Sequence, residues 1–214
     1  HDLIIIGAGV VGLASAYAAA RRGASVLLVD RNAGPALGTS FANGAQLSYV
    51  YTDAMAGPTT WGQLPQMAFG RNGAFRTHWS ADLDFVRWGL SFLRQANAGA
   101  LRRNTLATLE LALESRQAMQ ALLQRHPIAF DHVVSGKLHL YPSSEGVQGA
   151  AGMIALKQPY GVHQRLVDAE EARRIEPALH GAPWLAGAVY SPEEEAGDPY
   201  LFSTGLLDIL TGQY

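Results

Sequence analysis

The sequence contains no cysteine and has a small net charge. Without cysteine, the chain cannot form disulfides, thiolate metal sites, iron–sulfur clusters or a cysteine nucleophile. A formal net charge of −2 gives no electrostatic basis for binding nucleic acid. With 48% hydrophobic and 16% charged residues over 214 positions, the composition is that of a globular protein with a sizeable core, in one large or two small domains. The absence of cysteine fits a cytoplasmic protein, which is the location we expect.

One uncharged stretch approaches the length of a membrane span. The 18 residues from Leu3 to Ala20 carry no charge, which is near the lower limit for a span. Clustered glycines and a second strand pattern directly afterwards argue against that interpretation. Ala18-Ala19-Ala20 resembles a signal-peptidase site, but no basic segment precedes it, and cleavage would remove the glycines. We therefore expect this stretch to be part of the folded protein.

Three glycines in this stretch have the spacing of a dinucleotide-binding loop. The apolar run from Leu3 to Ile6 does not alternate, which predicts a strand buried on both faces. Gly7 then allows a tight turn, and Gly9 lets the backbone approach a pyrophosphate. Gly12 lets the following helix pack close to the sheet. The first turn of that helix has free N–H groups and the positive end of the helix dipole, so it favours an anion.

A second strand and an acidic residue complete the pattern. We expect a helix from about Val10 to Arg22, and a second parallel strand from Ser25 to Val29 in a right-handed βαβ unit. Asp30 lies 18 residues after Gly12, where a carboxylate can accept hydrogen bonds from the ribose of an adenosine. The same carboxylate would repel a 2′-phosphate, so the pattern predicts an adenine dinucleotide other than NADP.

The polar segment from Gly38 to Gln46 is rich in glycine and small residues. It is either a surface loop or a loop whose backbone amides reach a flat polar ligand, and periodicity does not decide between them. With the glycine pattern, the segment Thr39 to Ser48 resembles the N-terminus of FAD-dependent D-amino-acid dehydrogenases, a group related to glycine oxidase, sarcosine oxidase and D-amino-acid oxidase. The resemblance continues at Gly136–Tyr141, Glu176–Leu179 and Glu195–Phe202.

The resemblance implies a cofactor, a reaction and partners. The cofactor is FAD, and the reaction is oxidation of a D-amino acid to an imine, which water converts to a 2-oxo acid and ammonia. The partners are a small amino-acid substrate and an electron acceptor, which is a quinone, a carrier or oxygen. The residues expected to bind FAD are Gly7, Ala8, Gly9, Val10, Val11, Gly12, Asp30, Arg31, Thr39, Ser40, Asn43, Gly44, Ala45, Gln46 and Leu47. No catalytic residue is assigned.

Two departures from the family pattern leave the substrate open. The family loop usually reads Asn-Ala-Gly-Gln, whereas this chain has Asn43-Gly44-Ala45-Gln46. The next segment, Tyr49 to Pro58, also differs from the family run that approaches the substrate. Enzymes acting on proline, hydroxyproline, glycine or an opine are therefore alternatives. Two further alternatives are an NAD-dependent dehydrogenase and a nucleotide-binding subunit or fragment without its own activity.

Helical patterns dominate the middle of the chain. Trp61 to Thr77 indicates irregular structure with one short helix, and Asp82 to Ala96 indicates an amphipathic helix. A longer helix is expected from Ala100 to Arg125, before Pro127. We expect these two helices to pack together over a sheet. The alternative is a helix that binds a partner or lies peripherally on the inner membrane.

A hairpin is expected next, with strands Phe130–Val134 and Lys137–Tyr141 joined at Ser135-Gly136. This pairing places His132 opposite His139, but a third ligand is missing, so we expect no metal. In the resembled family an antiparallel sheet roofs the substrate pocket. The candidate substrate residues are therefore Tyr49, Tyr51, His132, His139 and Tyr141.

The last third of the chain alternates helices and strands. Helices are expected at Ser143–Leu156, at Asp168–Ile175 with Asp168 as N-cap, and at Pro199–Gly212, with strands at Gly161–Val167 and Leu185–Tyr190. Glu193-Glu194-Glu195 is interpreted as a solvated loop.

These elements predict an α/β protein whose second domain is α+β. Residues 1–48 begin a Rossmann-like FAD-binding domain, 49–197 form a substrate domain with antiparallel strands and long helices, and 198–214 return to the first domain. Because only two parallel strands are evident, we expect the rest of the sheet to come from a missing C-terminal half or from another subunit.

Overall fold

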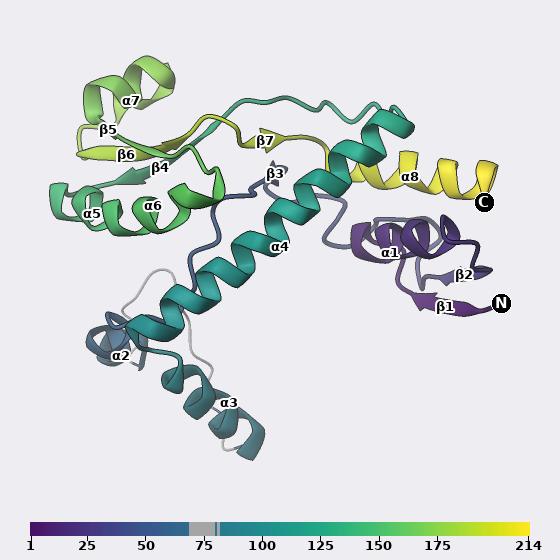
Figure 1. The fold of residues 1–214 in the computed structure, drawn as a ribbon, viewed down its shortest axis with the longest axis horizontal. Helices are drawn as coiled ribbons and strands as arrows, with labels where there is room; N and C mark the ends of the chain where they lie inside the picture. Colours follow the sequence, from purple (N-terminus) through teal and green to yellow (C-terminus); the bar gives the residue numbers. More distant parts are fainter. Residues whose placement is uncertain (69–79, 81) are drawn as a thin grey trace.

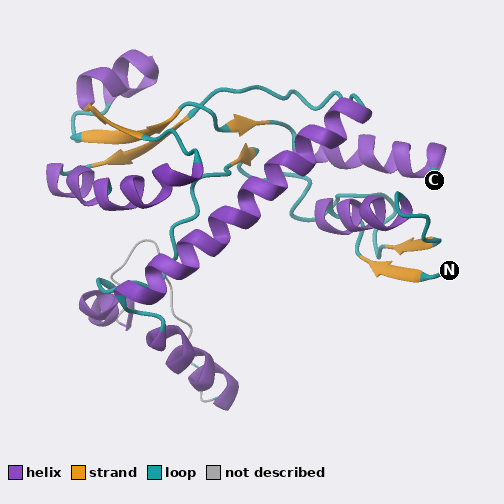
Figure 2. Ribbon diagram, in the orientation of Figure 1, coloured by secondary structure: helices purple, strands orange, loops and turns teal. Residues whose placement is uncertain are grey.

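A long helix joins the parts of the protein in a computed structural model, which describes residues 1–68, 80 and 82–214 (Figures 1 and 2). Helix α4, Ala98–Arg125, runs diagonally through the molecule. Near its C-terminal end lies a unit formed by both chain termini, with β1, β2, α1 and α8. On the other side of α4 lies a unit with β4, β5 and β6. Helices α2 and α3 project from the N-terminal end of α4 (Figure 1).

The first unit has the predicted βαβ arrangement. Strand β1, Leu3–Ile6, pairs in parallel with β2, Val26–Val29, and α1, Val10–Ala20, connects them. Helix α8, Pro199–Gln213, packs against α1. Their shared core contains buried Leu13, Tyr17, Leu122, Phe130, Phe202 and Leu206. The α/β class is thus confirmed, and the unit brings the two ends of the chain together.

Strand β1 is more exposed than its sequence predicts. Ile4 is 61% exposed and Ile6 is 88% exposed, so the prediction of a strand buried on both faces is wrong for this chain. In the described part of the chain the sheet has only two strands, and helix α1 covers one face. The apolar run therefore has more hydrophobic surface than these residues can bury.

The second unit is built on an antiparallel sheet in the order β4-β6-β5. Strand β4 is Lys137–Tyr141, β5 is Arg165–Asp168 and β6 is Gly187–Ser191. One face packs on α7, Ala169–Ile175, and buries Val167, Ala172, Ala182, Leu185 and Ala188. Helices α5, Ser144–Gly149, and α6, Ala151–Lys157, lie close to the sheet (Figure 1).

The predicted hairpin is wrong. Strand β4 pairs with β6, with His139 opposite Val189, and Val133 instead bridges to Ala196. Phe130 explains the difference, because its ring is buried against Phe202 and its carbonyl accepts a hydrogen bond from the Asp198 N–H. These contacts hold the segment near the first unit, so it cannot turn back onto β4.

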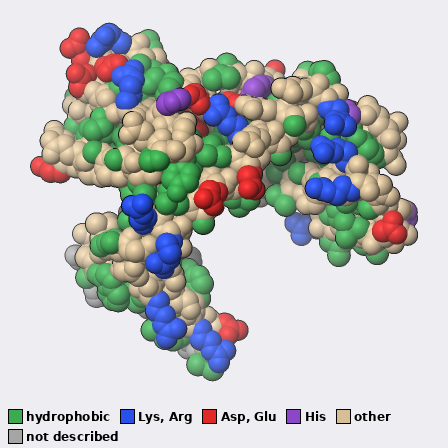
Figure 3. Space-filling model, in the orientation of Figure 1, with side chains coloured by type: hydrophobic (Ala, Val, Ile, Leu, Met, Phe, Trp, Pro, Cys, Tyr) green, Lys and Arg blue, Asp and Glu red, His purple; other side chains and the backbone are tan. Residues whose placement is uncertain are grey.

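The helix predictions are confirmed in position but not always in packing. Helix α4 begins after Asn97, whose side chain accepts from the Ala100 N–H. Helix α3, Leu83–Arg94, begins after the predicted Asp82, but none of its residues is buried. The two helices therefore do not cover one sheet together. Figure 3 shows hydrophobic side chains exposed along the α2–α3 arm. The exposed hydrophobic residues of α3 include Leu83, Trp88 and Leu90.

The remaining elements are short. Helix α2, Thr60–Ala68, is the short helix expected within 61–77, while residues 69–77 lie outside the described residues. The single helix expected from Ser143 to Leu156 is divided at Ala150 into α5 and α6, in a glycine-rich stretch that disfavours a continuous helix. Asp168 caps α7 as predicted. Short 3₁₀ turns occur at η1, Gln158–Tyr160, and η2, Pro177–Gly181.

Two very short strands lie where the chain passes between the units. Strand β3, Gln46–Leu47, pairs antiparallel with β7, Glu195–Ala196. The domain boundaries expected after residues 48 and 197 fall next to these strands and stay predictions. Of the helices in the described residues, none is long and apolar enough to cross a membrane.

Candidate functional site

The glycine loop has the geometry that its sequence predicts. Gly7 has a φ of +106°, a conformation that side chains disfavour. A Cβ atom at Gly12 would lie 1.8 Å from the Gly7 carbonyl oxygen, so only glycine fits there. Helix α1 begins after Gly9, which has no capping side chain, and the N–H groups of Val11 and Gly12 find no acceptor among the described residues. The helix therefore presents free donors.

Two side chains brought from later in the sequence complete this loop. Asp30 Oδ2 accepts from the Ala8 N–H at 2.7 Å, and Ser40 Oγ accepts from the Val10 N–H at 3.1 Å. The hydrogen bond from the Ala8 N–H, and to a smaller extent the one from the Asn32 N–H, lowers the pKa of Asp30. This carboxylate therefore stays charged. The structure thus brings Ser40 together with the expected cofactor residues of the first thirty positions. Its hydrogen bond with Val10 holds the Thr39–Ser40 segment beside the glycine loop.

These residues fit the ADP half of FAD. Asp30 at the end of β2 would hold the ribose, and the free N–H groups of α1 would hold the pyrophosphate. A Cβ at Gly9 would come within 3.3 Å of Ser40 Oγ, so a side chain here would narrow the approach to the loop. Arg31 follows Asp30, and its charge contributes to the lowered pKa of that carboxyl.

The second expected cofactor segment, Asn43 to Leu47, lies between the units. The Ala45 N–H donates to Asn43 Oδ1, and the Ala45 carbonyl accepts from the Gly197 N–H. Ala45 has a φ of +54°, in the left-handed region that favours glycine. This is the position at which the resembled family pattern has glycine, whereas Gly44 has room for a side chain. Gln46 and Leu47 then pair with β7.

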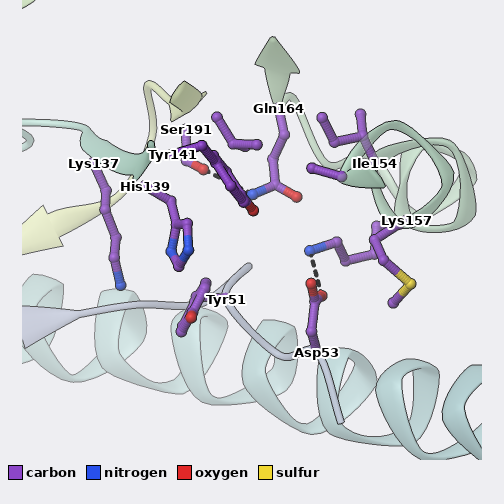
Figure 4. Close-up of a pocket in the computed structure, with 12 residues that line it drawn as sticks. Tyr51, Asp53, Lys137, His139, Tyr141, Ile154, Lys157, Gln164 and Ser191 are labelled. Carbon is purple, nitrogen blue, oxygen red and sulfur yellow. Dashed lines mark hydrogen bonds and ion pairs between the residues drawn. The ribbon is translucent and has the colours of Figure 1, made fainter. Parts of the chain in front are cut away.

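Three of the five expected substrate residues meet in one pocket, which we call the Tyr51 pocket. Tyr51 stacks on His139 with ring centroids 5.0 Å apart, and His139 lies 4.9 Å from Tyr141 (Figure 4). The lining residues are Tyr51, Asp53, Lys137, His139, Tyr141, Ala150, Met153, Ile154, Lys157, Gln164, Val189 and Ser191. No local pattern marks Lys137, Asp53 and Lys157 as pocket residues, because their hydrogen-bond partners are distant in the sequence.

The other two expected substrate residues lie elsewhere. Tyr49 is 6% exposed and lies beside Arg116, and burial raises the pKa of its hydroxyl to about 12. His132 Nε2 lies 2.8 Å from Glu195 Oε2, and its ring stacks on Phe130. The two histidines expected to face each other therefore do not. Across the described ranges, no group of three or more His, Asp or Glu residues could hold a metal ion.

The three consecutive glutamates are a correction to the predicted solvated loop. Glu194 is 2% exposed and Glu195 is 8% exposed. Glu194 Oε1 accepts from the N–H groups of Tyr49 and Val50, at 2.8 and 3.0 Å. Of the three, only Glu193 reaches solvent, and its hydrogen bonds with His163 and then with Arg116 lower the pKa of its carboxyl. Through Glu194, the run thus holds in place the segment that leads from β3 to Tyr51.

Burial controls the ionisation of the pocket. It lowers the pKa of His139, with help from the charges of Lys137 and Lys157, so the imidazole is neutral at neutral pH. It raises the pKa of both Tyr51 and Tyr141, which keeps these hydroxyls protonated. The pocket is therefore an aromatic surface whose charges are the two lysines and Asp53.

Comparison with known proteins identifies relatives along the whole chain. D-amino acid dehydrogenase 2 of Ralstonia nicotianae is 37% identical over 211 residues, which cover 98% of this chain and 50% of that protein. D-amino acid dehydrogenase of Dechloromonas aromatica is 34% identical over 207 residues, covering 96% and 50%. The chain thus spans about half the length of the curated relatives it matches.

Solved structures share the fold. L-proline dehydrogenase from P. horikoshii has a TM-score of 0.66 at 18% identity, covering 99% of this chain and 41% of that one. Glycine oxidase from Geobacillus kaustophilus has a TM-score of 0.65 at 20% identity, covering 98% and 44%. L-alpha-glycerophosphate oxidase from Mycoplasma pneumoniae, solved with FAD bound, has a TM-score of 0.58 at 16% identity, covering 99% and 42%.

The family match settles the class of cofactor. A model of a family described as FAD dependent oxidoreductase matches residues 2–213. This match agrees with the FAD expected from the sequence and not with the NAD-dependent alternative. The chain belongs to the family of FAD-dependent oxidoreductases.

Proposed function

We propose that the protein containing this chain oxidises D-amino acids. The observation that carries the proposal is the 37% identity to D-amino acid dehydrogenase 2 over 98% of the chain. The substrate loses two electrons and two protons, as a hydride and a proton, and becomes an imine. Water then replaces the imine nitrogen, which gives a 2-oxo acid and ammonia. Bound FAD supplies the electron acceptor of the first step.

The chain's own residues bind the cofactor, orient the substrate and exclude water. The glycine loop and Asp30 hold the nucleotide end of the cofactor, and β3 leads from the second cofactor segment to the substrate side. Tyr51, His139 and Tyr141 form a neutral aromatic surface against which an amino acid can lie. In this proposal the substrate amine binds uncharged, so no side chain of the pocket has to remove its proton.

The visible spectrum of the flavin tests the proposal. The purified chain, alone and mixed with the C-terminal half of the Ralstonia relative, is reconstituted with FAD and kept without oxygen. We expect D-alanine to bleach the flavin bands and L-alanine to leave them unchanged. Glycine and L-proline test the alternatives that the unusual 49–58 segment leaves open. Bound flavin that none of these amino acids reduces would contradict the proposal.

The electron acceptor needs a separate measurement. We propose that reduced flavin passes its electrons to a quinone or carrier, as the name dehydrogenase of the relatives suggests. A dye that accepts electrons should then support turnover in the absence of oxygen. Formation of hydrogen peroxide at the same rate in air would point to an oxidase instead.

A further inference from the structure

The chain contains only two lysines, and both line the Tyr51 pocket. Lys137 and Lys157 are the lysines, and the rest of the 16 Lys and Arg residues are arginines. Lys137 comes from β4 and Lys157 from the end of α6 (Figure 4). An ammonium in a half-buried pocket is costly unless an anion balances it, so each lysine needs a partner.

Lys157 has its anion within the chain. Its Nζ donates to Asp53 Oδ1 at 2.8 Å and to the Val50 carbonyl at 2.9 Å. The Lys157 side chain is only 3% exposed. This pair fastens the segment after β3 to α6, and it leaves no charge for a ligand.

Lys137 has no anion in contact. Its Nζ donates to Ser48 Oγ at 2.9 Å and lies 4.3 Å from the centre of the Tyr51 ring, and both partners are neutral. Within the described residues it makes no ion pair. Burial lowers the pKa of Lys137, and the more distant Glu194 carboxylate opposes that shift. The Lys137 ammonium therefore has no anion within hydrogen-bonding distance among the described residues, and the only carboxylate that acts on it does so from farther away.

Lys137 lies where the pocket meets the expected cofactor segment. Ser48 directly follows β3, so Lys137 lies at the end of the pocket next to the expected cofactor residues Gln46 and Leu47. Figure 4 shows Lys137 at the end opposite Lys157. The inner space of the pocket, about 20 Å³, admits one water molecule. An amino acid bound at this pocket would therefore lie across its mouth, where Tyr51 is 51% exposed.

We propose that Lys137 is a carboxylate-binding residue at the β3 end of the Tyr51 pocket, and that it binds a carboxylate group of the substrate. Among the groups that line the pocket, His139, Tyr51 and Tyr141 are neutral and Asp53 is paired with Lys157, so none of them repels an anion strongly. The more distant Glu194 carboxylate is the charge that opposes a bound anion. The carboxylate is either the one beside the amine or a second one on the side chain. The assignment to a substrate rests on the proposed function.

Nuclear magnetic resonance of the chain tests the site without any turnover. Reductive methylation with ¹³C-formaldehyde labels Lys137 and the exposed N-terminal amine, and Lys137→Met identifies the lysine signal. We expect D-alanine or acetate to shift the Lys137 signal saturably at constant ionic strength, while the N-terminal signal stays in place. Equal, non-saturating shifts of both signals, or no shift, would overturn the site.

Kinetics of the reconstituted enzyme then identify the carboxylate. Loss of one charge-assisted hydrogen bond in Lys137→Met should raise KM about 10- to 100-fold with little change in kcat. The rise should occur for D-alanine and D-glutamate if Lys137 binds the carboxylate beside the amine, and only for D-glutamate if it binds a second one. Lys137→Arg should restore the lower KM.

A matched control lies on the opposite face of the same sheet. Arg165 of β5 is also a cation over a tyrosine ring, that of Tyr190, which points away from the pocket. Arg165→Met should leave KM unchanged. An active enzyme whose KM values are the same in Lys137→Met would overturn the inference. An inactive wild-type enzyme with a saturable Lys137 signal would instead refute the proposed function and keep the anion site.

Discussion

Replacing Glu194 should destabilise the link between the cofactor segment and the pocket. Its carboxylate is 2% exposed and accepts from two backbone N–H groups, those of Tyr49 and Val50. Glu194→Ala leaves both donors buried without a partner, at about 1–3 kcal/mol each. Allowing for some entry of water, we expect the free energy of unfolding to fall by about 3 kcal/mol. For a chain of this size, that corresponds to a fall in melting temperature of about 6–12 °C.

Two further variants separate the hydrogen bonds from the charge. Glu194→Gln keeps one oxygen as the acceptor but buries a new N–H₂ group where Oε2 has no partner, so we expect a loss of about 1–2 kcal/mol. Glu193→Ala is the control, because the Glu193 carboxylate is 42% exposed and its ion pairs are worth at most about 1 kcal/mol.

Urea unfolding and amide hydrogen exchange measure these effects. The expected order of destabilisation is Glu194→Ala, then Glu194→Gln, then Glu193→Ala. Exchange should accelerate specifically at the Tyr49 and Val50 amides in Glu194→Ala. A Glu194→Ala protein as stable as Glu193→Ala, with both amides still protected, would show that the carboxylate does not hold this segment.

Three other changes test the loops and the pocket. Gly12→Ala should unfold the first unit in circular dichroism melts, because its Cβ would lie 1.8 Å from the Gly7 carbonyl oxygen. Gly9→Val should keep the fold and abolish FAD binding in a fluorescence titration. Stoichiometric FAD in Gly9→Val would refute the assignment of the glycine loop as the FAD site. Ala45→Gly should raise stability in urea by about 0.5–1 kcal/mol, since it relieves a left-handed alanine, and an unchanged midpoint would mean no strain. Burial lowers the folded pKa of His139, so its contribution to stability is complete above about pH 6.5 and is lost as pH falls. His139→Gln should flatten the urea stability profile between pH 7 and 5, and an unaltered slope would exclude this imidazole as the source.

Local signals in the sequence predicted the parts of the fold that depend on near neighbours. The βαβ unit follows from glycines and apolar runs a few residues apart, and Asp82 and Asp168 begin helices because they accept from N–H groups two or three residues later. The conformation of the glycine loop follows from the same local pattern, whereas the contacts of Asp30 with Ala8 and of Ser40 with Val10 join residues 22 and 30 positions apart.

Contacts between distant segments were not predictable in this way. A run of three glutamates is usually solvated, and nothing near Glu194 indicates that it accepts from Tyr49 and Val50, more than a hundred residues earlier. The pairing of β4 with β6 depends in the same way on distant residues. A hairpin with a glycine turn was the shorter connection, but the burial of Phe130 elsewhere prevented it.

Helix α4 fixes the spacing and the mutual rotation of the glycine loop and the Tyr51 pocket. Leu109 packs beside Tyr49 and Val50, while Leu122 packs in the core of the first unit. These two leucines are separated by about 20 Å along the helix axis and point about 140° apart around it. Inserting one residue between them would rotate the two contact faces by about 100° relative to each other. Insertions in this interval should therefore misalign the glycine loop and the Tyr51 pocket even if both units stay folded, which ties the relative placement of the two candidate sites to the length of α4.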